Sequence, residues 1–215
     1  MSNSMGAESP ATATRWAGVG MDARRSERRK LLVEAGFELF GTEGEGAVTV
    51  RAVSRAARLH TRYFYENFSD TGELLGAIFD YVVAGLVEHV RAAIAPDRGP
   101  AGRRPLIVRS VLEFCSADPR RGRVLFTEAR ANPVLTERRE AAQRMFIDVV
   151  LERSAAERPD EDPGRARVGA AMVTGAFVEV IQEWIAGRLG TDVDAVADYT
   201  SELSLPLLAP FESRL

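Results

Sequence analysis

The chain has 215 residues, of which 46% are hydrophobic and 27% are charged, and its net charge is −3. These values are typical of a soluble globular protein, and the single cysteine, Cys115, excludes an intrachain disulfide and favours a reducing compartment. The N-terminal residues lack the apolar segment of a signal peptide, and no apolar run approaches the roughly 18 residues of a membrane span, so we expect a cytoplasmic protein without membrane contact.

The first 24 residues are rich in Ser, Ala, Thr and Gly and show no apolar periodicity, which predicts a disordered arm. From Ser26 onward, small and apolar residues recur with the spacing of an amphipathic helix. These residues are Leu32, Ala35, Gly36, Leu39 and Phe40. Gly44 is placed to take a left-handed conformation where this helix ends, and Thr49 is a candidate N-cap for the next helix.

Residues 48 to 75, VTVRAVSRAARLHTRYFYENFSDTGELL, indicate two short helices joined by a tight turn. In the second helix, roughly residues 61–68, Phe64 and Phe68 are four apart and can share one buried face. The remaining side chains point elsewhere, and Thr, Arg, Tyr and Asn carry the groups that reach phosphate oxygens and base edges. The stretch therefore predicts a helix-turn-helix that reads DNA.

Asp70 and Glu73 form an Asp-x-x-Glu box, which predicts that a further helix starts at Thr71. The rest of the chain has helical periodicity, is interrupted by breaks that contain Pro or Gly, and lacks the period-two alternation of strands. The expected helices cover residues 71–94, 105–117, 118–131, 133–157, 165–188 and 192–208. We predict an all-α fold of about nine helices, divided into a disordered arm (1–24), a helix-turn-helix domain of three helices (25–72) and a helical effector-binding and dimerisation domain (73–215).

The charge is unevenly distributed along the chain. Nine basic and six acidic side chains between Asp22 and Arg62 give this segment a net charge of +3, which leaves −6 for the remainder. A basic end on an acidic body suits a protein that docks DNA with one end only. The cluster from Arg24 to Lys30 is either a basic arm that follows the DNA backbone or a solvated helix start.

The pattern of the N-terminal region resembles the tetracycline-repressor (TetR-like) family of transcriptional regulators. The positions that carry this resemblance are Leu31, Leu32, Ala35, Leu39, Phe40, Gly44, Thr49, Val50, Val53, Ala57, Leu59, Tyr65, Phe68, Leu74 and Leu75. The resemblance implies a homodimer with an N-terminal DNA-binding domain and a C-terminal domain for ligand binding and dimerisation. Most members of the family repress transcription and release DNA when a small molecule binds.

Three positions depart from the pattern of the family. Arg58 stands in the turn where the family usually has Gly, so it must accept a left-handed conformation at some cost or the turn must differ. His60 replaces the usual capping Ser, so we expect Thr61 to take over the cap. Thr71 replaces the usual phosphate-facing Lys and keeps only a hydroxyl at a helix N-terminus.

Arg62 lies near the N-terminus of the second short helix, which is the end expected to enter the major groove. The resemblance implies that the hydroxyl of Tyr65 touches the DNA backbone, although its ring can also pack against the core. The full set of expected DNA contacts is Thr49, Arg51, Arg58, Thr61, Arg62, Tyr63, Tyr65, Asn67 and Thr71.

The helix expected over residues 165–188 is apolar nearly all round, so it must be buried on more than one side. The resemblance implies that one side meets the same helix of a second subunit, and the last helix supplies the other half of a four-helix interface. The expected dimer contacts are Gly169, Val173, Val180, Trp184, Val196 and Leu203.

A ligand pocket is harder to derive, because each candidate lining residue also fits an ordinary core position. The candidates are Phe79, Val83, Phe114, Phe126, Glu128, Met145, Val149, Met172 and Phe177. Polar residues are scarce in these helices, so we expect an unknown effector that is largely apolar or aromatic.

We find no motif for catalysis, for a metal site or for a cofactor: two histidines and one cysteine provide no metal-spaced set, nucleophile elbow or phosphate-binding loop. Together with this absence of catalytic motifs, the resemblance implies a homodimeric, ligand-responsive repressor that a small, mostly apolar molecule releases from a near-palindromic double-stranded operator. Two alternatives stay open: a helical interaction or sensor protein without specific DNA binding, and a DNA-binding dimer without a ligand.

Overall fold

The computed structural model describes residues 11–93, 100–127 and 132–208, and these ranges contain helices and no strand. The elements are α1 (Ala11–Glu43), the 3₁₀ turn η1 (Glu45–Ala47), α2 (Val50–Ala56), α3 (Thr61–Tyr65), α4 (Thr71–Ala93), α5 (Pro100–Ala117), α6 (Pro119–Gly122), the π-helical turn η2 (Arg123–Thr127), α7 (Pro133–Glu157), α8 (Pro163–Ile185) and α9 (Val193–Leu208). Nine α-helices within the described ranges confirm the prediction of an all-α fold.

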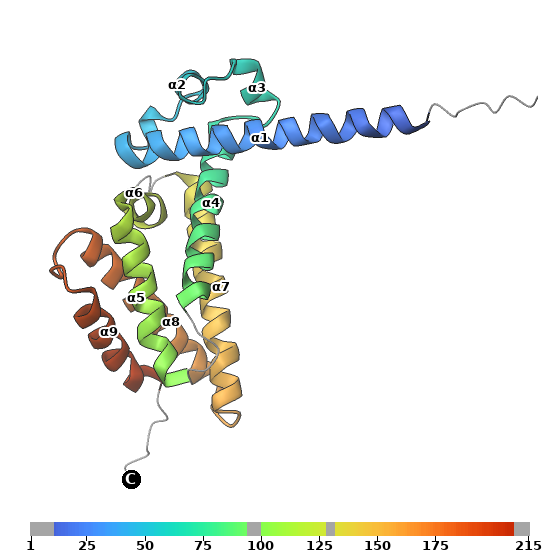
Figure 1. Ribbon diagram of the computed structural model, residues 1–215. Coiled ribbons are helices and arrows are strands. Elements are labelled where there is room, and N and C mark those ends of the chain that lie inside the picture. Colours follow the sequence, from blue (N-terminus) through green and yellow to red (C-terminus); the bar gives the residue numbers. More distant parts are fainter. Residues whose placement is uncertain (1–10, 94–99, 128–131, 209–215) are drawn as a thin grey trace, which may run out of the picture.

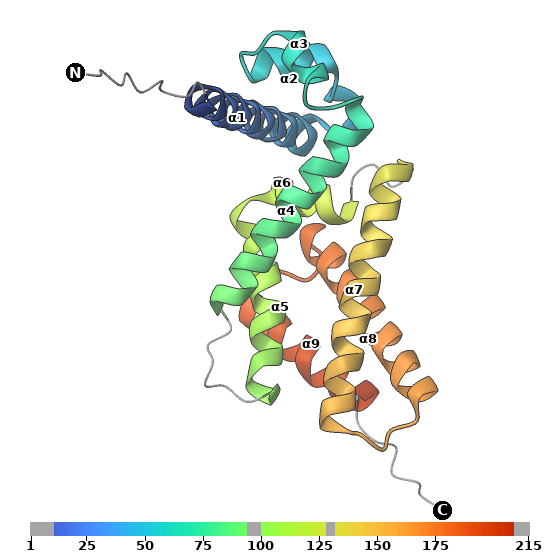
Figure 2. The same cartoon turned by 90° about the vertical axis from the view of Figure 1, so that its right-hand side faces the viewer.

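The helices form a small N-terminal unit on top of a larger body. Figure 1 shows α1 lying across one end of the molecule, with α2 and α3 on the side that faces away from the body. The long helix α4 leaves this unit and runs down into the body, where it packs against α5 and α7. Figure 2 shows α8 and α9 behind α7 and α5, so the body is a layered bundle of five long helices.

The N-terminal unit is held to α4 by a close approach of two helices. A Cβ atom on Gly36 of α1 would lie 2.7 Å from Ile78 Cδ1 and 3.3 Å from Leu74 Cδ2, so a larger residue here would force the ends of these side chains to shift. Leu32 and Phe40 of α1, like Leu74 and Ile78, are fully buried. Burial of side chains of this size stabilises the fold by roughly 1.5–3 kcal/mol each.

The first helix is much longer than expected. The helix predicted from Ser26 begins at Ala11, and therefore the arm predicted to be disordered over residues 1–24 is helical from residue 11, while residues 1–10 lie outside the described ranges. Residues 11–25 contain no proline, and they include four Ala, three Arg and one Met, which are good helix formers, so the helix continues beyond its packed part. In Figure 1 this extension projects past α3.

Local signals set several helix starts. Asp118 and Asn132 are extended N-caps whose side chains accept backbone N–H groups, and each is followed by a proline in the first turn, as expected. The helix predicted over residues 118–131 is shorter, because α6 ends at Gly122 and the chain continues as the π-helical turn η2. Pro100 begins α5 five residues before the predicted start.

By length and composition alone, α8 would suffice to cross a membrane, contrary to the sequence-based expectation. In the structure, α8 packs against α5, α7 and α9, and it buries Gly169, Ala170, Thr174 and Ile181. These neighbours account for part of its apolar character, while Val168 and Met172 of the same helix are exposed. Cys115 on α5 is also buried, which raises the pKa of its thiol to about 12 and makes it a small hydrophobic residue rather than a reactive group.

Candidate nucleic-acid interface and effector cavity

The first helix of the helix-turn-helix is capped as the sequence predicts. Thr49 has an extended backbone, and its Oγ1 accepts the N–H of Ala52 at 3.2 Å, so it is the N-cap of α2. The cap leaves Thr49 and Arg51 exposed at the start of the helix. Unpaired N–H groups and the helix dipole make such a start a favourable place for a phosphate.

The turn between α2 and α3 forces a non-glycine residue into the left-handed region. Arg58 has a φ of 54°, and within the described ranges it is the one residue other than glycine with a positive φ. The turn closes through a hydrogen bond from the N–H of Leu59 to the carbonyl of Ser54 at 2.9 Å. The first of the two expectations for Arg58 is therefore confirmed: the turn keeps its geometry and the arginine accepts the strain.

His60, and not Thr61, caps the second short helix. His60 has an extended backbone with φ −70° and ψ 143°, and its Nδ1 accepts the N–H of Arg62 at 3.1 Å. The expectation that Thr61 would take over the cap is wrong, because the imidazole ring reaches the same backbone N–H that a serine hydroxyl would reach. The helix consequently begins at Thr61, and it ends at Tyr65 rather than at Phe68.

The aromatic residues of this region divide between core and surface. Phe64 and Phe68 are fully buried and their ring centroids lie 5.7 Å apart, as the spacing predicted. Tyr65 is 64% exposed and its ring meets Phe64 edge-on, so the hydroxyl is free to reach a partner outside the protein. Tyr63 is half-buried, and the guanidinium of Arg28 lies 4.6 Å above its ring centre.

Asn67 is placed differently from the expectation. Its side chain is buried and donates from Nδ2 to the carbonyl of Tyr63 at 2.7 Å, while Arg29 donates to the carbonyl of Asn67 at 2.8 Å. A side chain enclosed in this way holds the end of α3 and does not present its amide to DNA in this conformation. The periodic pattern missed this, because it specifies the spacing of apolar residues and not the polar groups that fold back on the backbone.

The basic cluster from Arg24 to Lys30 is also split by the fold. Arg28 pairs with Glu66 at 3.6 Å, and Arg29 lies over the Phe68 ring with 4.2 Å between its Cζ and the ring centre. These two arginines therefore pack α1 against the end of α3. Arg24 and Arg25 are exposed on the extended part of α1.

Arg62 is the basic residue of α3, and its side chain is accessible to a partner. Its side chain is 79% exposed and its Nε donates to Glu66 Oε1 at 2.9 Å. An exposed pair of this kind contributes at most about 1 kcal/mol, so Arg62 can exchange it for a phosphate or a base at little cost. Arg51, Arg58, Arg62 and Tyr65 are exposed, while Thr61 and Thr71 are half-buried.

The expected box at the start of α4 is confirmed. Asp70 Oδ1 accepts the N–H of Glu73 at 2.8 Å, and Glu73 Oε2 accepts the N–H of Ser69 at 2.8 Å. The hydrogen bond from the Ser69 backbone lowers the pKa of Glu73 below its ordinary value, despite partial desolvation. The box fixes the corner at which α4 leaves the helix-turn-helix.

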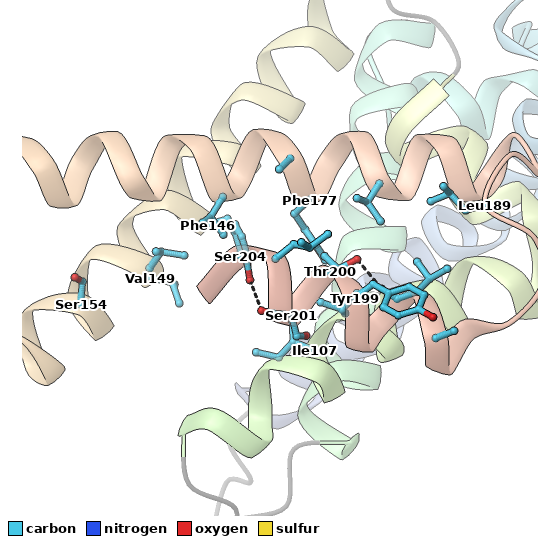
Figure 3. Close-up of a pocket in the computed structure, with 18 of the residues that line it drawn as sticks. Ile107, Phe146, Val149, Ser154, Phe177, Leu189, Tyr199, Thr200, Ser201 and Ser204 are labelled. Atoms are coloured by element: carbon cyan, nitrogen blue, oxygen red, sulfur yellow. Dashed lines mark hydrogen bonds between the residues drawn. The ribbon is translucent and has the colours of Figure 1, made fainter. Parts of the chain in front are cut away.

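The body contains a cavity of about 530 Å³ between α5, α7, α8 and α9, shown in Figure 3. Its walls are mostly apolar and include Phe146 and Val150 of α7, Phe177 of α8 and Val196 of α9. The size is within the range of small-ligand sites in proteins.

The residues predicted to bind a ligand fall into three groups. Val149 and Phe177 line the cavity. Phe79 and Phe114 lie in the buried core, with Val83 and Phe126 packed against it. Met145 and Met172 are exposed, and Glu128 lies outside the described residues.

The residues predicted at the dimer interface also lie in several places. The cavity wall contains Val173, Val180, Val196 and Leu203. Gly169 is buried, and half-buried Trp184 donates from Nε1 to Ser116 Oγ at 2.9 Å.

The exposed apolar residues of the body provide a different candidate for a subunit interface. Val168 and Met172 of α8 are four residues apart and more than half exposed, and Gly175 continues the same row with an open surface. Tyr199 and Leu203 of α9 are 64% and 74% exposed. An uncovered row of apolar side chains on a long helix is typical of a protein–protein contact.

Some cavity residues were absent from the prediction, notably Phe146, Ser154, Arg158 and Tyr199. Phe146, Val149 and Val150 have helical spacing, which was the available signal on α7. Among the described residues, no group of three or more His, Cys, Asp or Glu side chains is arranged to hold a metal ion.

Comparison with known proteins agrees with this geometry. Residues 32–78 match the family model of bacterial regulatory proteins of the tetR family. The HTH-type transcriptional activator FasR of Mycolicibacterium smegmatis is 25% identical over 184 residues, which cover 84% of this chain and 82% of that protein.

Two solved structures are similar over most of their length. The fatty acid degradation regulator FadR from Bacillus halodurans has a TM-score of 0.67 at 16% identity and covers 87% of this chain and 97% of its own. FadR from Bacillus subtilis in complex with stearoyl-CoA has a TM-score of 0.68 at 15% identity and covers 81% and 96%. Residues 32–78 of this chain thus match the model of the tetR family, and the whole fold is similar to that of TetR-like transcriptional regulators.

We predict that Arg58→Gly stabilises the protein and weakens its binding to DNA. Removal of the left-handed strain should raise the free energy of unfolding by roughly 0.5–1 kcal/mol, measured by chemical denaturation. Loss of one cation should reduce the salt dependence of DNA binding by about one unit of slope per subunit. The control Arg58→Ala loses the same charge but keeps the strain, so equal stability of the two variants would contradict the first part.

Proposed function

We propose that the protein is a homodimeric, non-catalytic transcriptional regulator in the cytoplasm, which binds a near-palindromic operator and changes its DNA affinity when a small, mostly apolar molecule enters the body. The observation that carries this proposal is the combination of an exposed helix-turn-helix and an apolar cavity in one chain. A body without a cavity would have favoured a dimer that lacks an effector.

The DNA-binding face consists of the exposed side chains of α2, of α3 and of the turn that joins these two helices. Arg62 and Tyr65 lie on α3, and Arg51 and Arg58 lie beside it, so cations surround the helix that would enter the major groove. Thr49 and Thr71 start two helices nearby and fit phosphates. In a symmetric dimer the two copies of α3 would contact half-sites separated by one or more turns of DNA.

Coupling between the cavity and the DNA would pass through two connections. The first is α4, a continuous helix from the helix-turn-helix into the body. The second joins α6 and η2 to α1: Arg123 of η2 donates to the carbonyls of Gly41 and Thr42 at 2.9 and 3.0 Å, and Arg120 of α6 pairs with Glu38. A ligand that favours one arrangement of these helices would shift the population towards one spacing of the two α3 helices.

The effector we propose is an apolar molecule with a long chain. The cavity is mostly apolar, and the structure of Bacillus subtilis FadR, which shares this fold, is a complex with stearoyl-CoA. For the direction of regulation we propose repression, as the resemblance to the family implies. The related protein FasR is called an activator, so a reporter assay with the native promoter would decide the sign.

The proposal is tested by titrating native upstream DNA and scrambled DNA with purified protein over a series of salt concentrations. We expect saturable binding at least about a hundredfold tighter to the native sequence, with a steep dependence on salt. Weak and equal binding to both DNAs, and to every fragment of a genomic library, would contradict the proposal. Equal binding of the native site with and without a bound effector would contradict the ligand response alone.

We predict that Arg62→Ala weakens operator binding by roughly 1–3 kcal/mol and relaxes the preference at one base pair, because a base contact from the N-terminal part of α3 is lost. The measurement is a competition assay with single-base variants of the operator. Arg91→Ala is a matched control, since Arg91 is exposed and paired with Glu88 at 3.0 Å but lies far along α4. A uniform loss over all sequences would instead assign Arg62 to a phosphate.

We predict that Met172→Arg converts the dimer to a monomer, because a charge in the middle of the exposed apolar row of α8 would have to be buried on association. Sedimentation should show the smaller species, and operator binding should fall with it. Met21→Arg, at a methionine on the extended part of α1 that is also more than half exposed, should leave the dimer intact. A Met172→Arg protein that stays dimeric would place the interface elsewhere.

A further inference from the structure

One end of the cavity carries a compact cluster of charged and polar groups. Ser154 and Arg158 lie in the last turns of α7 and at its end, and they contribute to the cavity wall. Arg158 donates to Ser154 Oγ at 2.6 Å and to Glu161 Oε1 at 3.2 Å, and the Ser154 hydroxyl donates to Glu161 Oε2 at 2.7 Å. Arg165, in the first turn of α8, reaches the same carboxylate at 3.3 Å.

The cluster is largely withdrawn from solvent. Ser154 is 6% exposed, and the side chains of Arg158 and Glu161 are 19% and 11% exposed. Charges in such a place require partners, because desolvation of an unpaired ion is costly. The printed hydrogen bonds join two guanidinium groups to one carboxylate, and the arginine that lines the cavity is Arg158.

The rest of the cavity does not offer a comparable cation. The hydroxyls of Thr200 and Ser201 donate to carbonyls of their own helix, at 2.7 and 2.8 Å. At the opposite end, Asp192 caps α9 by accepting the N–H of Ala195 at 3.0 Å. Figure 3 shows Ser154 at one end and Leu189 at the other, with Phe146, Val149 and Phe177 between them.

The length of the cavity suits a chain rather than a compact ring system. Lining residues of α9 and its cap run from Asp192 to Ser204, a span of about 18 Å at the rise of an α-helix. The apolar section therefore leads along α9 from the charged cluster towards Leu189.

We propose that the cavity binds an amphipathic molecule with an unbranched apolar tail and an anionic head, and that Arg158 and Ser154 hold this head in place of Glu161. This inference rests on the proposed function of the cavity as the effector site. The head is a free carboxylate or the phosphate groups of a carrier thioester, since both present anionic oxygens to a guanidinium.

The exchange is feasible because it leaves every charge paired. When the ligand head takes the place of the Glu161 carboxylate on Arg158, Glu161 keeps its contact with Arg165. Arg158 is then paired with the anionic head of the ligand, while the tail displaces water from the apolar walls.

The test compares three probes with the same tail: dodecanoate, dodecan-1-ol and dodecylamine, each kept below the concentration at which it forms micelles. Isothermal titration with the full-length protein should give the tightest binding for dodecanoate, about tenfold tighter than the alcohol, because a charge-assisted hydrogen bond is gained. The amine should bind most weakly. A fourth titration with dodecanoyl-CoA distinguishes the two sources of the anion.

Two substitutions should move the affinity for dodecanoate in opposite directions. Arg158→Gln should reduce it about tenfold to the level of the alcohol, and Glu161→Gln should raise it, because the internal competitor for Arg158 is removed. Neither should change binding of dodecan-1-ol. Arg188→Gln is the matched control, since Arg188 pairs with Glu183 near the far end of α8.

The outcomes separate this inference from the proposed function. Equal binding of acid and alcohol, unchanged by Arg158→Gln or Glu161→Gln, would overturn the role of Arg158 and leave the apolar cavity as the effector site. Tightest binding of the amine would assign the head to Glu161 and also overturn it. Failure of all probes to bind would contradict both. If Arg158→Gln does not fold, the gain in affinity from Glu161→Gln still decides the matter.

Discussion

The close packing of α1 on α4 at Gly36 is the contact on which the rest of the structure depends. Because no side chain separates the two helices there, Leu74 and Ile78 of α4 enter the core of the N-terminal unit. The same helix then continues into the body and contacts α5 and α7. A displacement of α4 in the body would therefore be passed to the helix-turn-helix, which is the route we propose for communication between a ligand and DNA.

The helix proposed to face DNA, α3, is too short to be stable alone. Isolated helices of fewer than about 12 residues are marginal in water, and α3 has only five residues. It persists because Phe64 and Phe68 are buried, His60 caps its start, and Arg29 and Asn67 hold its end. Packing and capping from behind leave the outward side of α3 free, so surface cations there can serve recognition without supporting the fold.

The apolar cavity and the charged cluster at its end combine two kinds of interaction. Burial of a tail is nonspecific and increases with apolar area, whereas the pairing of an arginine with an anion depends on geometry. Since Arg158 pairs with Glu161, this guanidinium is not left without a partner in the free protein. The same carboxylate that stabilises the free state would therefore set the selectivity of the site.

Much of the N-terminal unit was predictable from the sequence by itself, because its local structure depends on neighbours within a few residues. Examples are the cap at Thr49, the strained turn at Arg58, the buried pair Phe64 and Phe68, and the box of Asp70 and Glu73. The role of Asn67 and the placement of the body helices were decided only by the tertiary structure. Met172 and Val173 are adjacent in α8, yet the first is exposed and the second lines the cavity. The sequence of a helix that is apolar nearly all round does not identify which side faces the cavity, a neighbouring helix or a second subunit. The environment of each side is set by helices that are distant in the chain.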